Sequence, residues 1–169
     1  MINPPFQVVR LENSHERSPF HSGSESLDSY LKQQVSQDVR RRVTACYVAL
    51  TANQRISGYY TLASASVLLS DLPIALSKRL PRYPTVPAIR MGRLAVDREF
   101  KGIGLGGALL ADALTRSLRS EIAAYALLVD AKDDSAAAFY KHHGLVELPC
   151  QPLKLFIPFA TVTGIASGM

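Results

Sequence analysis

The chain of 169 residues is poor in the residues that build disulfide frameworks and metal sites. Its two cysteines, Cys46 and Cys150, are too few for a disulfide framework and indicate a reducing compartment. The four histidines do not stand at ligand spacing with these cysteines, so we expect no metal site. The chain has no run of about 18 apolar residues, which argues against a membrane-spanning helix. The first residues lack the basic-then-apolar order of a signal peptide, and we expect a cytoplasmic protein without membrane contact.

What is present is a moderately basic chain with enough apolar residues for a core. Hydrophobic residues make up 47% of the sequence, and we expect a single domain over residues 1–169. Lysine and arginine number 19 against 14 acidic residues, a formal net charge of +5. This excess is compatible with a polyanionic partner.

The most informative stretch is a glycine cluster that follows an apolar strand and opens a helix. Its members are Gly102, Gly104, Gly106 and Gly107. Glycines let the backbone approach a ligand closely, and the N–H groups that open a helix have no helical partner and carry its positive dipole end. The pattern therefore predicts an anion cradle, for which phosphate is the usual ligand.

Several known loops have related spacings. A Walker-type loop ends in Gly-Lys-Ser/Thr, whereas Ala108 and Leu109 follow the last glycine here, which excludes it. The dinucleotide spacing G-x-G-x-x-G fits, but that motif opens almost directly off a strand, and the five residues 97–101 intervene. A plain helix-capping turn is a further alternative, although four glycines in six residues exceed what a cap needs.

The strand before the glycines shows an irregular alternation. Its apolar phase runs through Ile89 and Met91 and then through Leu94 and Val96, so it slips by one residue at 92–93. Such a slip predicts a β-bulge, which would splay the strand from a parallel neighbour and free backbone N–H groups. An exposed edge bulge without a function is the alternative.

Periodicity along the chain predicts an α/β protein. We expect strands at 6–11, 43–50, 56–69, 88–97, 122–129, 145–148 and 153–159. We expect helices from Ser24 or Ser26 to about residue 42, at 103–118 with an inward stripe of Leu110, Leu114 and Leu118, and at 134–142. Residues 70–87 carry four prolines and are expected to form a long loop with one helical turn. This order favours a mixed sheet with a parallel centre.

Two motifs resemble signatures of the GNAT acetyltransferase superfamily. Lys101-Gly-Ile-Gly-Leu-Gly106, after Leu94-Ala-Val96, resembles its pyrophosphate loop, with lysine in place of glutamine or arginine. Asp134 to Leu145 resembles its second signature, with Asp134 in place of asparagine and Leu145 in place of phenylalanine. The resemblance implies the GNAT fold, whose mixed sheet has a splayed parallel pair of strands at its centre. It also implies acetyl-CoA as co-substrate and no metal.

The resemblance also implies roles for individual residues. Tyr140 stands where the family has its general acid, and a phenol with a pKa of about 10 suits that role. A core aromatic that anchors its helix is the alternative for this residue. The residues implied to bind acetyl-CoA are Leu94, Ala95, Val96, Lys101, Gly102, Ile103, Gly104, Leu105, Gly106, Gly107, Asp134 and Ala137.

No acidic residue is obviously placed as a general base, since Asp97 and Glu99 lie only near the glycine loop. Freeing a lysine amine at pH 7 costs about 4.6 kcal/mol, whereas freeing an α-amine costs about 1 kcal/mol. The lack of a base therefore favours an α-amino substrate.

Further segments are similar to the GNAT toxins of bacterial type II toxin–antitoxin systems. They include residues 27–31, 58–62, 80–84, 92–97 and 129–133, and the resemblance spans roughly residues 10–158. It implies acetylation of the α-amine of aminoacyl-tRNA, a block of translation and neutralisation by a ribbon-helix-helix antitoxin, and a homodimer is compatible with the family. The basic residues expected to bind tRNA are Arg40, Arg41, Lys78, Arg79, Arg82, Arg90 and Arg93. A small-molecule or protein N-acetyltransferase and a non-catalytic binding module are the alternatives.

Overall fold

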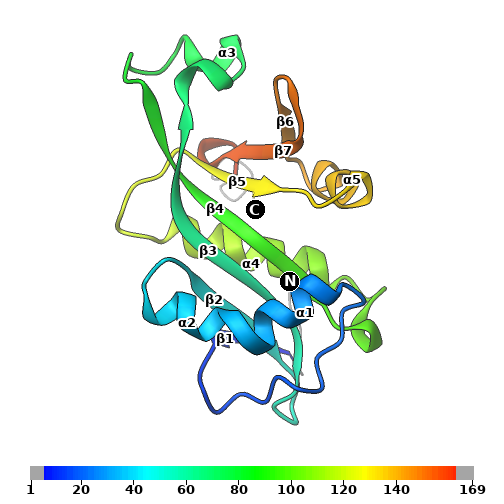
Figure 1. Cartoon of the computed structure of the whole chain (residues 1–169). Helices are drawn as coiled ribbons and strands as arrows, with labels where there is room; N and C mark the ends of the chain where they lie inside the picture. Colours follow the sequence, from blue (N-terminus) through cyan, green and yellow to red (C-terminus); the bar gives the residue numbers. More distant parts are fainter. Residues whose placement is uncertain (1–5, 163–169) are drawn as a thin grey trace. The chain divides into compact units, whose positions relative to one another are not determined.

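A computed structural model describes residues 6–162, which form a mixed sheet with helices (Figure 1). The seven strands follow the order β1-β2-β3-β4-β5-β7-β6. They are β1 (Gln7–Arg10), β2 (Ala45–Leu50), β3 (Ile56–Leu68), β4 (Thr85–Val96), β5 (Ala126–Asp130), β6 (Val146–Leu148) and β7 (Gln151–Pro158). The helical elements are α1 (Glu25–Ser29), η1 (Tyr30–Gln34), α2 (Val35–Arg40), η2 (Leu69–Asp71), α3 (Ile74–Ser77), η3 (Arg98–Phe100), α4 (Leu105–Leu118) and α5 (Asp134–His142).

The expected mixed sheet with a parallel pair is confirmed. Strands β4 and β5 pair in parallel from Ala88 with Ala126 to Met91 with Val129, and the other paired strands given by register are antiparallel. The chain divides into two compact units, one of residues up to 63 and 92–115, the other of residues 64–91 and from 116 onward. Strands β3 and β4 contribute to both units, and each unit is described by itself.

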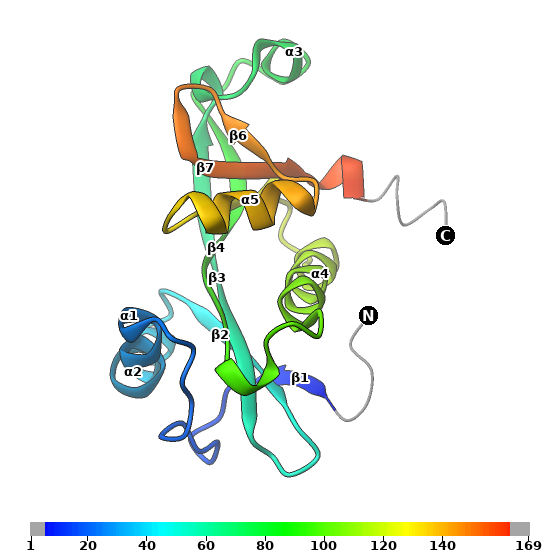
Figure 2. The same cartoon turned by 90° about the vertical axis from the view of Figure 1, so that its right-hand side faces the viewer.

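In the first unit, β3 is covered on both faces. Helices α1 and α2 lie on one side of this strand and α4 on the other (Figure 2). Its residues from Ile56 to Thr61 are consecutively buried, as a strand between two helical layers requires. The hydroxyl of Tyr59 donates to the carbonyl of Leu27 at 2.6 Å, and the hydroxyl of Tyr60 donates to Asp112 at 2.5 Å. Two consecutive tyrosines of one strand thus bind opposite helical layers.

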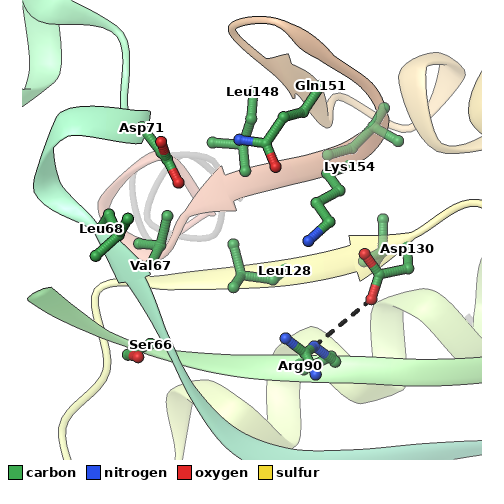
Figure 3. Close-up of a pocket in the computed structure, with 12 residues that line it drawn as sticks. Ser66, Val67, Leu68, Asp71, Arg90, Leu128, Asp130, Leu148, Gln151 and Lys154 are labelled. Carbon is green, nitrogen blue, oxygen red and sulfur yellow. Dashed lines mark ion pairs between the residues drawn. The ribbon is translucent and has the colours of Figure 1, made fainter.

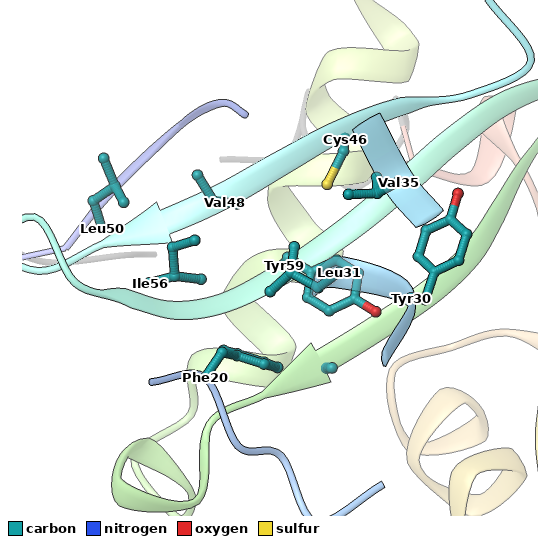
Figure 4. Close-up of a cluster of buried hydrophobic side chains, with 10 residues drawn as sticks. Phe20, Tyr30, Leu31, Val35, Cys46, Val48, Leu50, Ile56 and Tyr59 are labelled. Carbon is teal, nitrogen blue, oxygen red and sulfur yellow. The ribbon is translucent and has the colours of Figure 1, made fainter. Parts of the chain in front are cut away.

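The core between α1–α2 and the sheet is a single cluster of buried side chains (Figure 4). Tyr59 packs edge-on against Phe20, with ring centroids 5.6 Å apart. The cluster consists of Phe20, Tyr30, Leu31, Val35, Cys46, Val48, Leu50, Ile56, Tyr59 and Ala95. It includes Ala95, so the core supports the strand that leads into the glycine loop.

The first helical region begins and ends close to the positions expected from the sequence. Ser24 is its N-cap, and the side chain of this serine accepts a hydrogen bond from the amide of Leu27. The region is interrupted by the π-helical turn η1, which the sequence did not reveal. The segment ends after Arg40, and Arg42 adopts a positive φ of 61°.

The second unit is built on β5 and β7, which pair from Ala126 with Pro158 to Asp130 with Lys154. Strand β6 pairs with the outer side of β7, and α5 lies beside β7 (Figure 1). One core cluster of this unit consists of Val67, Leu72, Val86, Ala88, Ala126, Leu128, Leu148 and Phe156. The loop between β3 and β4 is tied at its base by the amide of Leu69, which donates to the carbonyl of Pro84.

Three expectations on local structure were wrong in detail. Strand β5 begins at Ala126 rather than at residue 122, where Ile122 is 82% exposed and so cannot lie in a covered strand. The loop expected over 70–87 contains two helical turns, η2 and α3, and β4 already begins at Thr85. Along β4, the alternation of buried and exposed residues shifts by one residue between Ala88 and Met91, and not at residues 92–93 as expected. The β-bulge itself stays a prediction.

The buried face of α4 also differs from the expected stripe. Leu110 of the expected stripe is buried, whereas Leu114 and Leu118 are only half-buried, and Leu105, Leu109 and Ala113 are buried in addition. The reason lies in β3, because Gly58 opens a space that Leu105 and Leu109 fill. Among residues 6–162, no helix is both long enough and apolar enough to cross a bilayer.

We predict that Gly58→Ala destabilises the protein by about 1–3 kcal/mol, because a core position with no free space does not accept a methyl group. The added Cβ would lie 2.8 Å from Leu109 Cδ1 and 3.0 Å from the carbonyl oxygen of Ala95. Urea denaturation measures the change in the free energy of unfolding. Gly92→Ala is the matched control, since its Cβ meets only the rotatable Thr61 hydroxyl at 3.3 Å, and we expect a smaller loss. Equal losses for the two variants would contradict the prediction.

Candidate active site

A buried carboxylate fixes the turn that precedes the glycine loop. Asp97 follows β4 and is only 1% exposed. Its side chain accepts hydrogen bonds from the amide of Glu99 at 3.0 Å and from the amide of His21 at 2.9 Å. It also pairs with Arg55, whose Nη2 lies 3.3 Å from Asp97 Oδ1. The backbone amide of Asp97 donates to Ser57, so one residue joins four segments of the first unit.

The segment around His21 supports the same turn from the other side. The amide of Arg98 donates to the carbonyl of His21 at 2.8 Å. The ammonium group of Lys101 donates to the carbonyl of Ser22 at 2.6 Å. Lys101 stands where the family has glutamine or arginine, and in this structure its side chain binds the N-terminal segment of the unit.

The glycine loop itself is exposed and has the backbone that only glycine adopts readily. Gly102 and Gly104 have φ angles of +80° and +83°, and a Cβ added to either would meet no atom within 4 Å. The first helical hydrogen bond of α4 in this region joins the amide of Ala108 to the carbonyl of Gly104. The amides of Leu105, Gly106 and Gly107 therefore open the helix without helical partners, at its positive dipole end. This geometry suits a phosphate group.

The strand end that enters this loop is anchored through one side chain. Ala95 is 5% exposed and belongs to the core cluster, while Leu94 and Val96 are half-buried. Of the remaining residues expected to bind acetyl-CoA in this unit, Ile103 is 60% exposed and Leu105, the first residue of α4, is buried. The backbone groups of these residues, rather than their side chains, are thus the parts suited to a ligand.

In the second unit, α5 presents Tyr140 from a well-defined helix. Asp133 caps this helix by accepting a hydrogen bond from the amide of Ala136 at 2.8 Å. Asp134 is exposed in the first turn, whereas Ala137 and Tyr140 are buried on the inner face. Phe139 is only half-buried and packs edge-on against Tyr140.

Burial and charge keep the Tyr140 phenol protonated. Burial and, as a smaller contribution, the negative charge of Asp130 together raise the pKa of Tyr140 to about 12. Burial also lowers the pKa of His143, and the neighbouring His142 adds to this. Tyr140 is therefore a hydrogen-bond donor at every pH in the physiological range.

Other titratable groups are poorly suited to catalysis. The Asp97 carboxylate is committed to the contacts described above, and Glu99 pairs with Arg55 at 2.6 Å. Burial raises the pKa of Cys46 to about 12, which leaves this thiol inert at neutral pH. Within residues 6–162, no group of three or more His, Cys, Asp or Glu side chains is placed to hold a metal ion.

The basic residues expected to bind tRNA lie in both units. In the first unit, Arg40 and Arg41 are exposed at the end of α2, and the Arg93 guanidinium lies 3.4 Å from the ring centroid of Tyr30. In the second unit, Lys78, Arg79, Arg82 and Arg90 are exposed. Arg90 pairs with Asp130 at 3.6 Å.

Comparison with known proteins identifies the family. The model of the acetyltransferase (GNAT) domain family matches residues 43–147, more than half of the chain. The chain belongs to the GNAT acetyltransferase family. The glycine loop and Tyr140 both lie inside the matched region, and the roles expected of them stay predictions.

Individual GNAT proteins are similar over most of their length. The tRNA-acetylating toxin of Mycobacterium tuberculosis (strain ATCC 25618 / H37Rv) is 37% identical over 88% of this chain and 89% of its own. The structure of AtaT complexed with acetyl-methionyl-tRNAfMet is 27% identical, with a TM-score of 0.85 over 95% of this chain and 99% of that one. The structure of AtaTR bound with AcCoA is 27% identical, with a TM-score of 0.79 over 95% and 98%.

Sequence reasoning missed the residues that support the GNAT loop. Arg55 lies in a hairpin turn that carries no recognisable motif, so only its contact with Asp97 reveals that it supports the glycine loop. Asp97 itself carried a signal, because aspartate between a strand and a helical turn is a common N-cap. The partner of Lys101, the carbonyl of Ser22, was not accessible to any local pattern.

We predict that Asp97→Asn weakens acetyl-CoA binding and lowers the free energy of unfolding by about 2–3 kcal/mol, because it removes a charged acceptor that three segments share. Glu99→Gln is the matched control, since it removes the exposed partner of the same arginine and should cost less than about 1 kcal/mol. Calorimetric titration with acetyl-CoA and urea denaturation measure the two effects. Wild-type affinity and stability in Asp97→Asn would show that the turn does not depend on this carboxylate.

Proposed function

We propose that this chain is an acetyl-CoA-dependent toxin acetyltransferase that acetylates the α-amine of aminoacyl-tRNA and so blocks translation. The observation that carries the proposal is the 37% identity to a tRNA-acetylating toxin over 88% of the chain. We further propose that residues 1–169 act as one GNAT domain in the cytoplasm, neutralised by a ribbon-helix-helix antitoxin.

In this proposal the glycine loop holds the pyrophosphate of acetyl-CoA. The amides that open α4 supply hydrogen-bond donors and the helix dipole, and the positive φ angles at Gly102 and Gly104 shape the loop. Lys101 stabilises the loop through Ser22 rather than by reaching a phosphate. Backbone groups at Leu94, Ala95 and Val96 polarise the thioester carbonyl, an effect worth roughly 3–4 kcal/mol per donor in other enzymes.

Tyr140 serves the leaving thiolate as a hydrogen-bond donor. The pKa of its phenol is about 12, whereas a thiol has a pKa of about 8.5. Complete proton transfer from this phenol to the thiolate would be uphill by about 5 kcal/mol. The buried hydroxyl therefore stabilises negative charge on sulfur, and solvent supplies the proton as the thiol leaves.

The acceptor amine loses its proton without a dedicated protein base. The acidic groups near the glycine loop, Asp97 and Glu99, are engaged by Arg55 and by backbone amides. An α-amine of an aminoacyl ester needs no more than about 1 kcal/mol to be freed at pH 7. The chemistry thus agrees with an aminoacyl acceptor rather than with a lysine side chain.

Exposed cations would hold the tRNA backbone. Lys78, Arg79 and Arg82 follow α3 and are all exposed, beside Tyr83, which is 69% exposed. Cations bind phosphates, and an exposed aromatic ring provides a surface on which a base can stack. We assign Arg40, Arg41, Arg90 and Arg93 to the same role.

The direct test is incubation with acetyl-CoA and a mixture of aminoacyl-tRNAs, followed by analysis of the 3′ ends. We expect acetyl groups on the α-amines and a rate that falls steeply as salt rises, because phosphate contacts release counterions. Uncharged tRNA is the control and should accept no acetyl group. Acetylation of free polyamines or peptides in place of aminoacyl-tRNA would favour a small-molecule or protein acetyltransferase, and no turnover would favour a binding module.

We predict that Tyr140→Phe lowers kcat by at least about tenfold while the affinity for acetyl-CoA stays close to that of the wild type. The ring remains to fill its buried site, and only the hydroxyl is lost. Since the pKa of Tyr140 is about 12, the wild-type rate should show no descending limb from this residue between pH 7 and pH 10. Stopped assays with calorimetric acetyl-CoA titration separate the two effects, and wild-type turnover in the variant would remove Tyr140 from the mechanism.

A further inference from the structure

A cavity of about 120 Å³ lies in the second unit, beside the parallel pair of strands. Side chains from β3, β4, β5, β6, β7 and η2 line it, and Figure 3 shows them converging from several sides. The lining residues are Ser66, Val67, Leu68, Asp71, Arg90, Leu128, Val129, Asp130, Leu148, Gln151, Lys154 and Leu155.

The cavity has an apolar end and a charged end. Val67, Leu128 and Leu148 are buried core residues, and their side chains form the apolar end, where the Asp71 carboxylate also lies, close to Val67 (Figure 3). At the other end, Asp130 pairs with Arg90 at 3.6 Å and lies directly opposite Lys154 in the β5–β7 register.

The charged end is electrostatically connected to the tyrosine of the mechanism. Asp130 both lines the cavity and lies close enough for its charge to raise the pKa of Tyr140. Both residues belong to the second unit, Asp130 at the end of β5 and Tyr140 on α5. A charged group bound beside Asp130 would therefore act on the carboxylate whose charge influences the phenol that serves the leaving thiolate.

The charges disfavour an anion as the occupant. Two cationic side chains, Arg90 and Lys154, and two carboxylates, Asp71 and Asp130, line the cavity, so the charges of these four groups sum to zero. An isolated phosphate would need an excess of cations, whereas an amine is attracted by a carboxylate. At the apolar end, three aliphatic side chains surround a single carboxylate, that of Asp71, and this surrounding suits an aliphatic group.

We infer that this cavity is the subsite for the aminoacyl group of the acceptor, with the α-amine toward Asp130 and the side chain toward Val67, Leu128 and Leu148. The inference rests on the proposed function and adds the substrate class. A cavity of about 150 Å³ accommodates benzene in another protein, so about 120 Å³ suits side chains smaller than an aromatic ring. The subsite thus selects small and medium uncharged side chains over aromatic and charged ones.

The test measures kcat/KM for glycyl-, valyl-, leucyl-, phenylalanyl- and lysyl-tRNA with the wild type and two cavity variants. We expect the wild type to acetylate valyl- or leucyl-tRNA at least about tenfold better than phenylalanyl- and lysyl-tRNA. Val67→Phe fills the cavity and should lower the leucyl-to-glycyl ratio by about tenfold or more. Leu148→Ala enlarges the cavity and should raise the phenylalanyl-to-leucyl ratio.

The matched control is Val146→Phe, which adds the same ring on β6 at a position that is 50% exposed and outside the cavity lining. Its substrate ratios should equal those of the wild type, and calorimetric acetyl-CoA binding verifies that each variant is folded. Should Val67→Phe fail to fold, Leu148→Ala decides the question alone. Unchanged ratios in the folded cavity variants overturn the subsite while leaving the proposed function intact. A wild type that acetylates no aminoacyl-tRNA overturns both.

Discussion

The buried carboxylate of Asp97 is the interaction on which the functional loop of the first unit depends. It accepts hydrogen bonds from the amides of His21 and Glu99 and pairs with the guanidinium of Arg55. It therefore joins the end of β4, the β2–β3 hairpin and the N-terminal segment. A charge with so little exposure is tolerated only with several partners, and those partners in turn lose their freedom to move. The first glycine of the loop, Gly102, follows five residues later, so the loop starts from a fixed position. Its flexible residues can therefore present amides in one arrangement.

Close packing on both faces of β3 explains why this strand carries both glycine and tyrosine in the first unit. Gly58 leaves room for Leu109 of α4, while Tyr59 and Tyr60 send their hydroxyls to opposite helical layers. A strand covered on both faces cannot use the usual alternation of apolar and polar residues. Here the polar tips of the tyrosines reach the edges of the layers, and their rings fill the interior.

The second unit combines burial and charge at its proposed reaction centre. Tyr140 is held on a capped helix and its phenol is kept neutral, which makes it a donor rather than a source of a full proton. Asp130 contributes to that effect and is itself held by Arg90. A carboxylate between cations lies at the end of an apolar cavity, an arrangement that suits an amine joined to an aliphatic side chain. Donor, carboxylate and cavity together describe an acceptor site more specific than the family alone implies.

The sequence by itself determined the order of elements, the family and the positions of the glycine loop and Tyr140. These features follow from local patterns. Positive φ angles favour glycine, buried and exposed residues alternate along strands, and the residues of a motif have fixed spacing. The start of β5, the inward face of α4 and the helical turns after β3 were misjudged because burial there depends on distant partners. Only the tertiary structure decided that Asp97 binds His21, 76 residues away, and that Lys101 binds Ser22, 79 residues away. Such contacts, like the cavity beside Asp130, join side chains whose distance in space no local pattern records.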